Sequence, residues 1–532
     1  MTEQSIQEVC EMEEAKGKPA LVFLLLLVCC VLLWGVPGQA QGNGPEVSYA
    51  VQHAISPPLR DMVENPFGSV ERHVVPLGRP NTVPRSAPQP DPVLQTSLGP
   101  LVSTTAGLNF LGVGVGITPT YSDCCAPPDT NGAVGATQFV QWVNLDLAVF
   151  SKSTGALVKG PIAGNTFWSS LGGQCAAHND GDPIAQYDKA NGRWVLAQPV
   201  FEKPYTYCIA VSTTSDATGA YNQYAFSLPR LDFPDYPKLG IWPDAYYASF
   251  NIFKGNSFAG ARACTYNGAA MRSGASAAQI CFQLSTSFAS LLPSDLDGAT
   301  APPAGSPDYY VNFGSNSLNL WKFHVDFTTP ANSTFTGPTN IPVAAFTQAS
   351  SIPQLDTTQT LDSLSDRVMY RFAYRNFGTY ESLLVNHSVT PGNGAVSGVR
   401  WYEIRSPGTT PTVFQSGTFA PDTNSRWMGS IAQDKLGDIA VGYSVSSSTM
   451  HPAIRYTGRV PTDPSGTLET EATIIQGNGS QQVNLNRWGD YSSISIDPSD
   501  DCTFWYTTEY LQADGTFNWS TRIASFKFSG CV

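Results

Sequence analysis

The chain has 532 residues and a formal net charge of −13 at pH 7. It contains only 29 Lys and Arg, and phosphate binding needs such residues in clusters, so the charge argues against a nucleic-acid partner. A hydrophobic content of 42% is enough for a large core and excludes disorder of the whole chain. With 47 Gly, 40 Pro and only 13% charged residues, the composition suits short strands and tight turns rather than long amphipathic helices.

Residues 1–40 predict a targeting segment. Lys16 and Lys18 precede an apolar run over residues 20–36, and the small residues Gly38 and Ala40 follow it. This pattern is typical of a signal peptide, with an uncleaved signal anchor as the alternative. In both cases we expect the rest of the chain to be secreted or extracytoplasmic, with membrane contact only through an uncleaved segment.

Eight cysteines follow the targeting segment, at positions 124, 125, 175, 208, 264, 281, 502 and 531. An even number in an exported chain predicts disulfides. Zinc is the competing interpretation, but no C-x-x-C spacing occurs and the histidines are scattered. The spacing leaves the connectivity open, and the local pairs Cys175–Cys208, Cys264–Cys281 and Cys502–Cys531 are plausible.

Residues 41–120 are rich in Pro, Gly and Ser, which predicts a spacer or a strap over the next domain. From residue 121 to 532 the chain changes to short alternating apolar runs that are separated by Gly, Asn and Asp. These runs indicate strands and turns within one large domain.

A pattern of about sixty residues repeats in the second half of the chain. Ser493, Ile494, Asp497, Asp501 and Tyr506 match residues of the same type 63 positions earlier, because 493 − 430 = 63. Arg-Trp at 487–488 matches Arg-Trp at 426–427, and residues around 367 match those around 426. Weaker copies begin near residues 127, 181, 235 and 308, which gives seven candidate units.

Seven all-strand units at a nearly fixed period predict an all-β fold, a β-propeller, most simply seven-bladed, although six or eight blades stay open. A β-sandwich would explain the alternation of apolar and polar residues but not the recurrence at a fixed period. A parallel β-helix would need far shorter repeats. Closure of a ring also explains how so long an all-β chain avoids open sheet edges.

In a propeller, residues at the start of each innermost strand gather around the central axis on one face. The sequence places seven charged residues at such positions: Asp129, Asp182, Asp235, Arg367, Arg426, Arg487 and Asp490. Arginines present forked donors that match acidic sugars, and paired carboxylates can act as acid and base. The alternative is that each Arg pairs with a neighbouring Asp and locks the ring.

Two turns resemble fragments of calcium loops. Asp129 and Asn131 lie in one turn, and Asp180 and Asp182 lie beside His178 in the other, but neither has the full EF-hand spacing. Ca²⁺ is the one cofactor that these oxygens predict, and ordinary turn hydrogen bonds are the alternative, as they are for Asp434 and Asp497.

Five tryptophans, at positions 194, 242, 427, 488 and 505, could stack on sugars if exposed. Packing between blades is the alternative, and we expect it for most of them. The sequence contains no G-x-S-x-G, H-E-x-x-H or phosphate-binding glycine loop, which disfavours the enzyme classes that depend on them.

Segments such as "PPDTNGAVG", "RWMGSIAQDKLGDIAVGYS" and "RWGDYSSISIDPSDDCTFWYTTEY" resemble exported bacterial proteins of the sialidase-like β-propeller superfamily. The resemblance spans about Pro127 to the C-terminus and implies a propeller and export. Sialidases use an arginine triad, a tyrosine–glutamate nucleophile pair and an aspartate acid/base. The resemblance therefore implies a triad of Arg367, Arg426 and Arg487, with Tyr370 or Tyr491 as the tyrosine, although the Arg-Ile-Pro sequence of that family is absent.

Three functions follow as hypotheses. The first is a monomeric binding module for an extracellular glycan or small anionic ligand, which is held by the Asp and Arg residues. The second is a glycoside hydrolase or polysaccharide lyase that acts on an acidic sugar. The third is a structural scaffold in which the charged residues join the blades.

Overall fold

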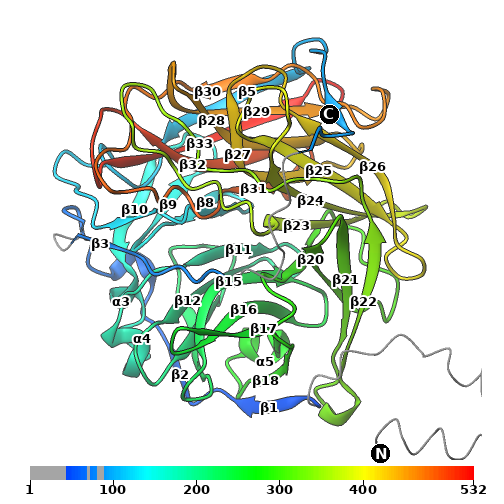
Figure 1. Ribbon diagram of the computed structural model, residues 1–532. Helices are drawn as coiled ribbons and strands as arrows, with labels where there is room; N and C mark the ends of the chain where they lie inside the picture. Colours follow the sequence, from blue (N-terminus) through cyan, green and yellow to red (C-terminus); the bar gives the residue numbers. More distant parts are fainter. Residues whose placement is uncertain (1–43, 69–71, 81–88) are drawn as a thin grey trace, which may run out of the picture. The chain divides into compact units, whose positions relative to one another are not determined.

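The computed structural model describes residues 44–68, 72–80 and 89–532 (Figure 1). The predicted signal or anchor segment lies outside these residues. No helix in the described part is long and apolar enough to cross a membrane.

The strands form seven antiparallel blades in chain order. Blade 1 contains β7 (Asn131–Val134), β8 (Gln138–Trp142), β9 (Asp146–Ser151) and β10 (Leu157–Ala163). Blade 2 contains β11 (Ile184–Asp188), β12 (Arg193–Val200), β13 (Thr206–Ser212) and β14 (Tyr221–Ser227). Blade 3 contains β15 (Phe233–Ile241), β16 (Tyr246–Lys254), β17 (Ser257–Tyr266) and β18 (Ala278–Gln283). Blade 4 contains β19 (Leu292–Asp297), β20 (Asp308–Gly314), β21 (Ser317–His324) and β22 (Thr334–Pro342).

The remaining blades follow the same plan. Blade 5 contains β23 (Met369–Asn376), β24 (Glu381–Val389), β25 (Gly398–Arg405) and β26 (Thr412–Phe419). Blade 6 contains β27 (Ser425–Gln433), β28 (Ile439–Ser447), β29 (Met450–Arg459) and β30 (Ala472–Ile475). Blade 7 contains β31 (Ser493–Ile496), β32 (Phe504–Leu511) and β33 (Trp519–Phe528), and its fourth strand is β5 (Thr104–Leu111) from the N-terminal part.

The innermost strands form a closed ring. Each first strand contacts the first strand of the next blade, in the order β7, β11, β15, β19, β23, β27 and β31, and β31 contacts β7 again. β19 and β23 pair directly as parallel strands, which joins blades 4 and 5 into one sheet. The predicted seven-bladed propeller is therefore confirmed.

The N-terminal part adds strands to the outside of several blades. β1 (Glu46–Tyr49) pairs with β18, β2 (Gln52–Ile55) pairs with β14, and β4 (Leu94–Gln95) pairs with β26. Figure 1 shows the blue β1 alongside the green β18. A short strand β3 (His73–Val74) pairs with β6 (Cys125–Ala126) just before blade 1. The extension is therefore strap-like, as the sequence predicts.

The core lies between neighbouring blades, so the middle strands are buried on both faces. All nine residues of β28 are buried, for example. This explains why many strands read as continuous apolar runs rather than as strict alternation. In the described ranges the helices are few and short: η1 (Leu59–Asp61), α3 (Gly164–Phe167), α4 (Gly173–Ala177), α5 (Gly268–Ser273) and η2 (Pro330–Asn332).

The repeat has a structural reason. Ser430 and Ser493 occupy equivalent places in adjacent inner strands, and the Ser430 hydroxyl accepts a hydrogen bond of 3.1 Å from the Ile494 amide. The Ser493 hydroxyl in turn donates to the Gly132 carbonyl of blade 1 at 2.7 Å. The repeated tryptophans Trp427 and Trp488 are fully buried, with ring centroids 5.9 Å apart.

The described residues contain four disulfides, and such bonds are typical of extracellular proteins. The three predicted local pairs, Cys175–Cys208, Cys264–Cys281 and Cys502–Cys531, are confirmed. The fourth joins the adjacent residues Cys124 and Cys125.

Candidate functional site

Three of the predicted aspartates share a backbone conformation at the entrance to an inner strand. Asp129, Asp182 and Asp490 have φ values of 47°, 51° and 55°, and β7, β11 and β31 follow them within three residues. Asp tolerates this left-handed region better than most residues. The repetition of Asp is therefore partly a requirement of the turn that feeds each inner strand.

The structure brings six of the seven predicted residues together at the axis. Asp129, Asp182, Asp235 and Asp490 are at most 4% exposed, and electrostatic interactions connect them to one another and to Arg487 and Arg367. We call the four aspartates, Arg487 and the buried Lys238 the axial cluster. Arg426 is the exception, because it lies with Asp422 and Glu471 in blade 6.

Each predicted arginine already has a carboxylate partner. Arg367 donates to both oxygens of Asp366 at 2.9 and 3.1 Å. Arg487 donates to both oxygens of Asp490. Arg426 makes paired contacts of 2.9 and 2.8 Å with Glu471 and a further bond of 2.8 Å to Asp422. These pairs leave little positive charge for an anionic ligand.

The other three aspartates of the axial cluster have no ion pair with a Lys or Arg within the described ranges. Neither oxygen of Asp129 has an N–H or O–H donor, and its neighbour is the Asp182 carboxyl. Asp182 accepts the Tyr236 amide at 3.1 Å. Asp235 accepts the Gly78 amide at 3.2 Å, and its second oxygen has no donor.

Burial sets the protonation of these carboxyls. Desolvation, then the charges of Asp490 and Asp182, raises the pKa of Asp129 well above its usual range. Desolvation, then Asp182, raises the pKa of Asp235 to about 8. At neutral pH we therefore expect Asp129 and Asp235 to be protonated, with Asp129 sharing its proton with Asp182.

Lys238 completes the axial cluster from the middle of β15. Its ammonium lies 3.4 Å from the ring centroid of Tyr236 and 4.0 Å from that of Tyr491. Desolvation lowers the pKa of Lys238 to about 7, although Asp182 and Asp129 oppose the shift. The predicted site set does not include this residue, and a lysine three positions after Asp235 in the same inner strand is the signal that could have found it.

Side chains from opposite blades fill the axis beneath the axial cluster. The Tyr236 hydroxyl donates to the Asp490 carbonyl at 3.3 Å, and the Tyr491 hydroxyl donates to the Pro183 carbonyl at 3.2 Å. Further along, Gln186 and the Tyr370 hydroxyl are 2.6 Å apart, which joins blade 2 to blade 5. A hollow of only about 20 Å³ remains beside them. The candidate tyrosines, Tyr370 and Tyr491, are therefore packed into the axis.

A segment of the N-terminal part lies across the mouth of the axial cluster. We call residues 72–80 the cover segment. Its Gly78 amide donates to Asp235, while Arg367 donates to the Gly78 carbonyl at 3.3 Å and Arg487 donates to the Val75 carbonyl. Val75 is fully buried. Three of the predicted ligand-binding residues therefore hold a segment of their own chain.

Ion pairs also fix the far end of the cover segment. Arg79 contacts Asp362 and lies 3.2 Å from Asp366, and both acids precede β23 of blade 5. Gly78 packs so closely on the Phe253 ring that an added Cβ would lie 2.1 Å from it. Any larger residue at this contact would require the Phe253 ring to move.

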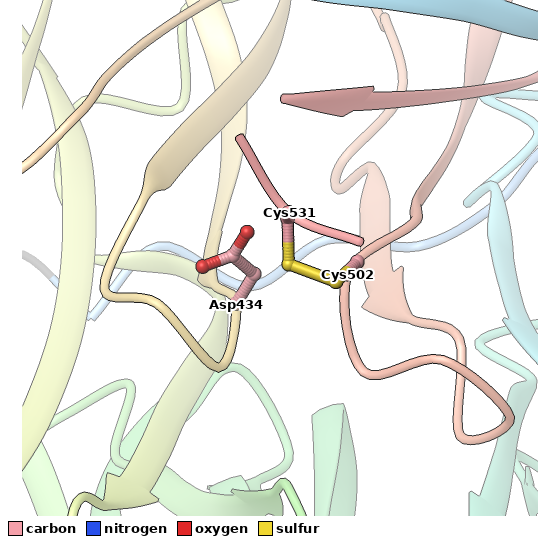
Figure 2. Close-up of side chains that lie close together, drawn as sticks. All are labelled: Asp434, Cys502 and Cys531. Carbon is pink, nitrogen blue, oxygen red and sulfur yellow. A yellow bond between two sulfur atoms is a disulfide. The ribbon is translucent and has the colours of Figure 1, made fainter. Parts of the chain in front are cut away.

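The predicted calcium ligands do not all face one point. Asp180 accepts the Phe201 amide at 2.7 Å, and the Asn131 side-chain oxygen accepts the Ala185 amide at 2.9 Å. The donor atoms of Asp434, Cys502 and Cys531 do come within 4.8 Å of one another, but the two sulfurs form a disulfide (Figure 2). Calcium binding at Asp129, Asn131, Asp180 and Asp182 stays a prediction.

Asp434 and Asp497 are turn residues, as predicted. Asp434 accepts the amides of Leu436 and Asp438, and Asp497 accepts the Ser499 amide. The five tryptophans considered for sugar stacking are at most 4% exposed, which confirms that they pack in the core.

No protein-family model and no curated protein matches the chain. Among solved structures, the chain is similar to the α-L-arabinofuranosidase Arb93A from Fusarium graminearum at 9% identity and a TM-score of 0.34, over 80% of this chain and 99% of that one. It is similar to the Penicillium chrysogenum α-L-arabinanase complexed with arabinobiose at 11% identity and a TM-score of 0.31, over 64% of this chain and 94% of that one. It is also similar to the N-terminal domain of Nup159 at 8% identity and a TM-score of 0.34, over 84% of this chain and all of that one.

Proposed function

We propose that this propeller is an extracellular glycan-binding protein whose ligand takes the place of the cover segment on the axial cluster. The observation that carries the proposal is that Asp235, Arg367 and Arg487 hold the backbone of residues 75–78 by one accepted and two donated hydrogen bonds. Sugar hydroxyls donate and accept in the same way. An oligosaccharide could therefore satisfy the same three side chains.

The charges support a neutral glycan rather than an acidic one. Four buried carboxyls in the axial cluster face Arg487 and Lys238, and Arg367 is paired with Asp366. An anionic sugar would bring a negative charge into a buried site whose Asp129 and Asp235 carboxyls are already protonated for lack of a cationic partner. Repulsion between like charges that are removed from water disfavours such a ligand.

Binding is tested with a panel of neutral and acidic oligosaccharides by calorimetry, together with hydrogen exchange of residues 72–80. We expect a neutral glycan to bind saturably and to speed the exchange of the cover segment. Asp235→Ala should weaken binding by at least tenfold, because a buried hydrogen bond to ligand is lost. Asp61→Asn, an exposed change in η1, is the control. A glycan that binds equally well to Asp235→Ala without changing the exchange of residues 72–80 would contradict the proposal.

Hydrolysis is the second candidate, and the protonation pattern favours it. Glycoside hydrolysis needs one carboxyl that donates a proton and one that is ionised. Asp235 has a pKa near 8 and lies at the cover segment, and Asp490, whose carboxyl is paired with Arg487, belongs to the same axial cluster. Release of reducing ends by the wild type, but not by an Asp235→Asn variant that still binds, would establish a hydrolase.

Calcium binding is tested on the same purified protein by thermal unfolding. If Asp129 and Asp182 bind Ca²⁺, millimolar CaCl₂ should raise Tm, and Asp129→Asn should remove that increase. Asn tolerates the left-handed backbone of residue 129, so this variant is expected to fold. An identical Tm with CaCl₂ and with EDTA would remove calcium from the proposal.

A further inference from the structure

A second cavity lies at the other end of the propeller axis, where the inner strands end. Its walls come from the residues that close β11, β15 and β19 and from the turn after β31. The axial cluster lies where the same strands begin. Tyr370, Gln186 and their neighbours fill the axis between the two ends, so this cavity is separate from the glycan site proposed above.

The lining of this cavity is mainly apolar. Ile241, Trp242, Leu296 and Pro498 contribute to its walls, and the exposed Ala190 and Ala301 contribute to its rim. The Trp242 indole is fixed, because its N–H donates to the Ser306 carbonyl and its ring packs 4.7 Å from the ring of Tyr374. Four different blades therefore supply one apolar surface.

The charged groups around the cavity are already paired. Lys189 contacts Asp297 and lies 3.3 Å from the Leu296 carbonyl. Both oxygens of Asp501 accept from Arg375 at 2.7 Å. Asp188 accepts the Tyr246 hydroxyl at 3.0 Å and the amide of Asn191. A charged ligand would have to compete with these partners, whereas an uncharged one would not.

Ion pairs between blades make the walls rigid. Arg371 donates to Asp297 at 2.7 Å between blades 5 and 4, and the Arg375–Asp501 pair joins blade 5 to blade 7. The cavity therefore does not depend on one mobile loop, and its shape is set by inner strands that belong to the ring. A preformed site of this kind loses little conformational entropy when a ligand binds.

The cavity has a volume of about 280 Å³. An apolar cavity of about 150 Å³ in another protein holds a single benzene molecule. We propose that this cavity is a binding site for a small uncharged molecule of two or three rings with a largely apolar surface. The ligand enters from the rim at Ala190 and Ala301 and rests on Ile241, Trp242 and Leu296.

Two fluorescent probes with the same ring skeleton test the class of ligand. Phenylnaphthylamine is neutral, and anilinonaphthalene sulfonate carries one negative charge. We expect saturable binding of the neutral probe to the full chain and at least tenfold weaker binding of the sulfonate. Equal affinities for the two probes, or no saturable binding of the neutral one, would overturn the assignment.

Substitutions at the rim then show whether the neutral probe binds in this cavity. Ala190→Trp and Ala301→Trp should each fill the rim from a different blade and weaken binding of the neutral probe by at least tenfold. Ala304→Trp is the matched control, because residue 304 is exposed in the same connection as Ala301 but does not line the cavity. All three positions are exposed, so Tm should stay within a few degrees of wild type. Unchanged probe binding in both rim variants would show that the probe sits elsewhere and would refute the site.

Discussion

At the axis, four aspartates are similarly buried but differ in their partners. Asp235 and Asp490 are the same residue type at the start of two inner strands, yet of the two only Asp490 forms an ion pair with an arginine. Without such a partner, the lost hydration of a carboxylate is larger than any gain from neighbouring dipoles. The proton on Asp235 is therefore a consequence of the fold and makes stability depend on pH.

The pH dependence has a defined sign. The pKa of Asp235 is about 8 in the folded protein and near 3.8 in the unfolded chain, so between these values the folded state binds the extra proton. Stability from this group is present at low pH and falls as pH rises. Asp235→Asn should make the fall in the free energy of unfolding between pH 5 and 7 shallower by about 1.4 kcal/mol per pH unit.

Urea unfolding at pH 5, 6 and 7 measures this slope, with Asp61→Asn as the control. The window stops at pH 7 because Lys238, whose folded pKa is about 7, adds a trend of opposite sign above that value. If the slopes of wild type and Asp235→Asn are the same, Asp235 is ionised in the folded protein and the assigned protonation is wrong.

At the scale of elements, the cover segment is the part of the N-terminal extension whose contacts bear directly on the site. It uses Arg79 to reach blade 5 and its backbone to reach Asp235, Arg367 and Arg487. Because the Arg79 side chain is one third exposed, its ion pairs contribute only modestly, roughly 1 kcal/mol.

Arg79→Ala should therefore loosen the cover segment without unfolding the ring. We expect faster hydrogen exchange of residues 72–80 and, if a glycan competes with this segment, about fivefold tighter glycan binding. Arg60→Ala is the matched control, because Arg60 forms an exposed pair with Asp216 away from the axis. Faster exchange with unchanged affinity would mean that the glycan binds somewhere else.

The positions of strands that belong to the sixty-residue repeat could be predicted from the sequence. The positions of strands without a matching segment in another unit could not. Two matched pairs repeat for a structural reason. The serines, Ser430 and Ser493, form hydrogen bonds between neighbouring blades, and the tryptophans, Trp427 and Trp488, fill the space between them. β19, with the sequence "LPSDLD", has no match in the other units and its position could not be predicted. The contact between Gly78 and Asp235 joins residues 157 positions apart, and no local pattern encodes it.

At the scale of the whole molecule, blade 7 differs from the others because its fourth strand comes from the other end of the described chain. β1, β2 and β4 each add a fifth strand to a blade that already has four, whereas β5 completes a blade that would otherwise have three. β5 pairs along β33, whose Phe526 belongs to the hydrophobic cluster that also contains Phe504 and Val102.

A truncation series tests this difference. A chain that begins at residue 89 lacks β1, β2 and the cover segment but keeps β5, and it should elute in gel filtration as a species of the same association state as the full chain, with a lower Tm. A chain that begins at residue 113 also lacks β5 and should associate or aggregate, because β33 then exposes an unpaired edge. Gel filtration and thermal unfolding compare the two. If both chains are monomeric with equal Tm, β5 does not stabilise the ring.

The origin of β5 also sets an order of events during synthesis. Asn109 and its partner Arg522 are 413 residues apart, and ribosomes add roughly 5 to 20 residues each second. β5 therefore waits on the order of 20 to 80 seconds before its partner strand exists. A product that stops before Trp519 can never complete blade 7, so an unpaired β5 marks an unfinished chain for proteases and chaperones.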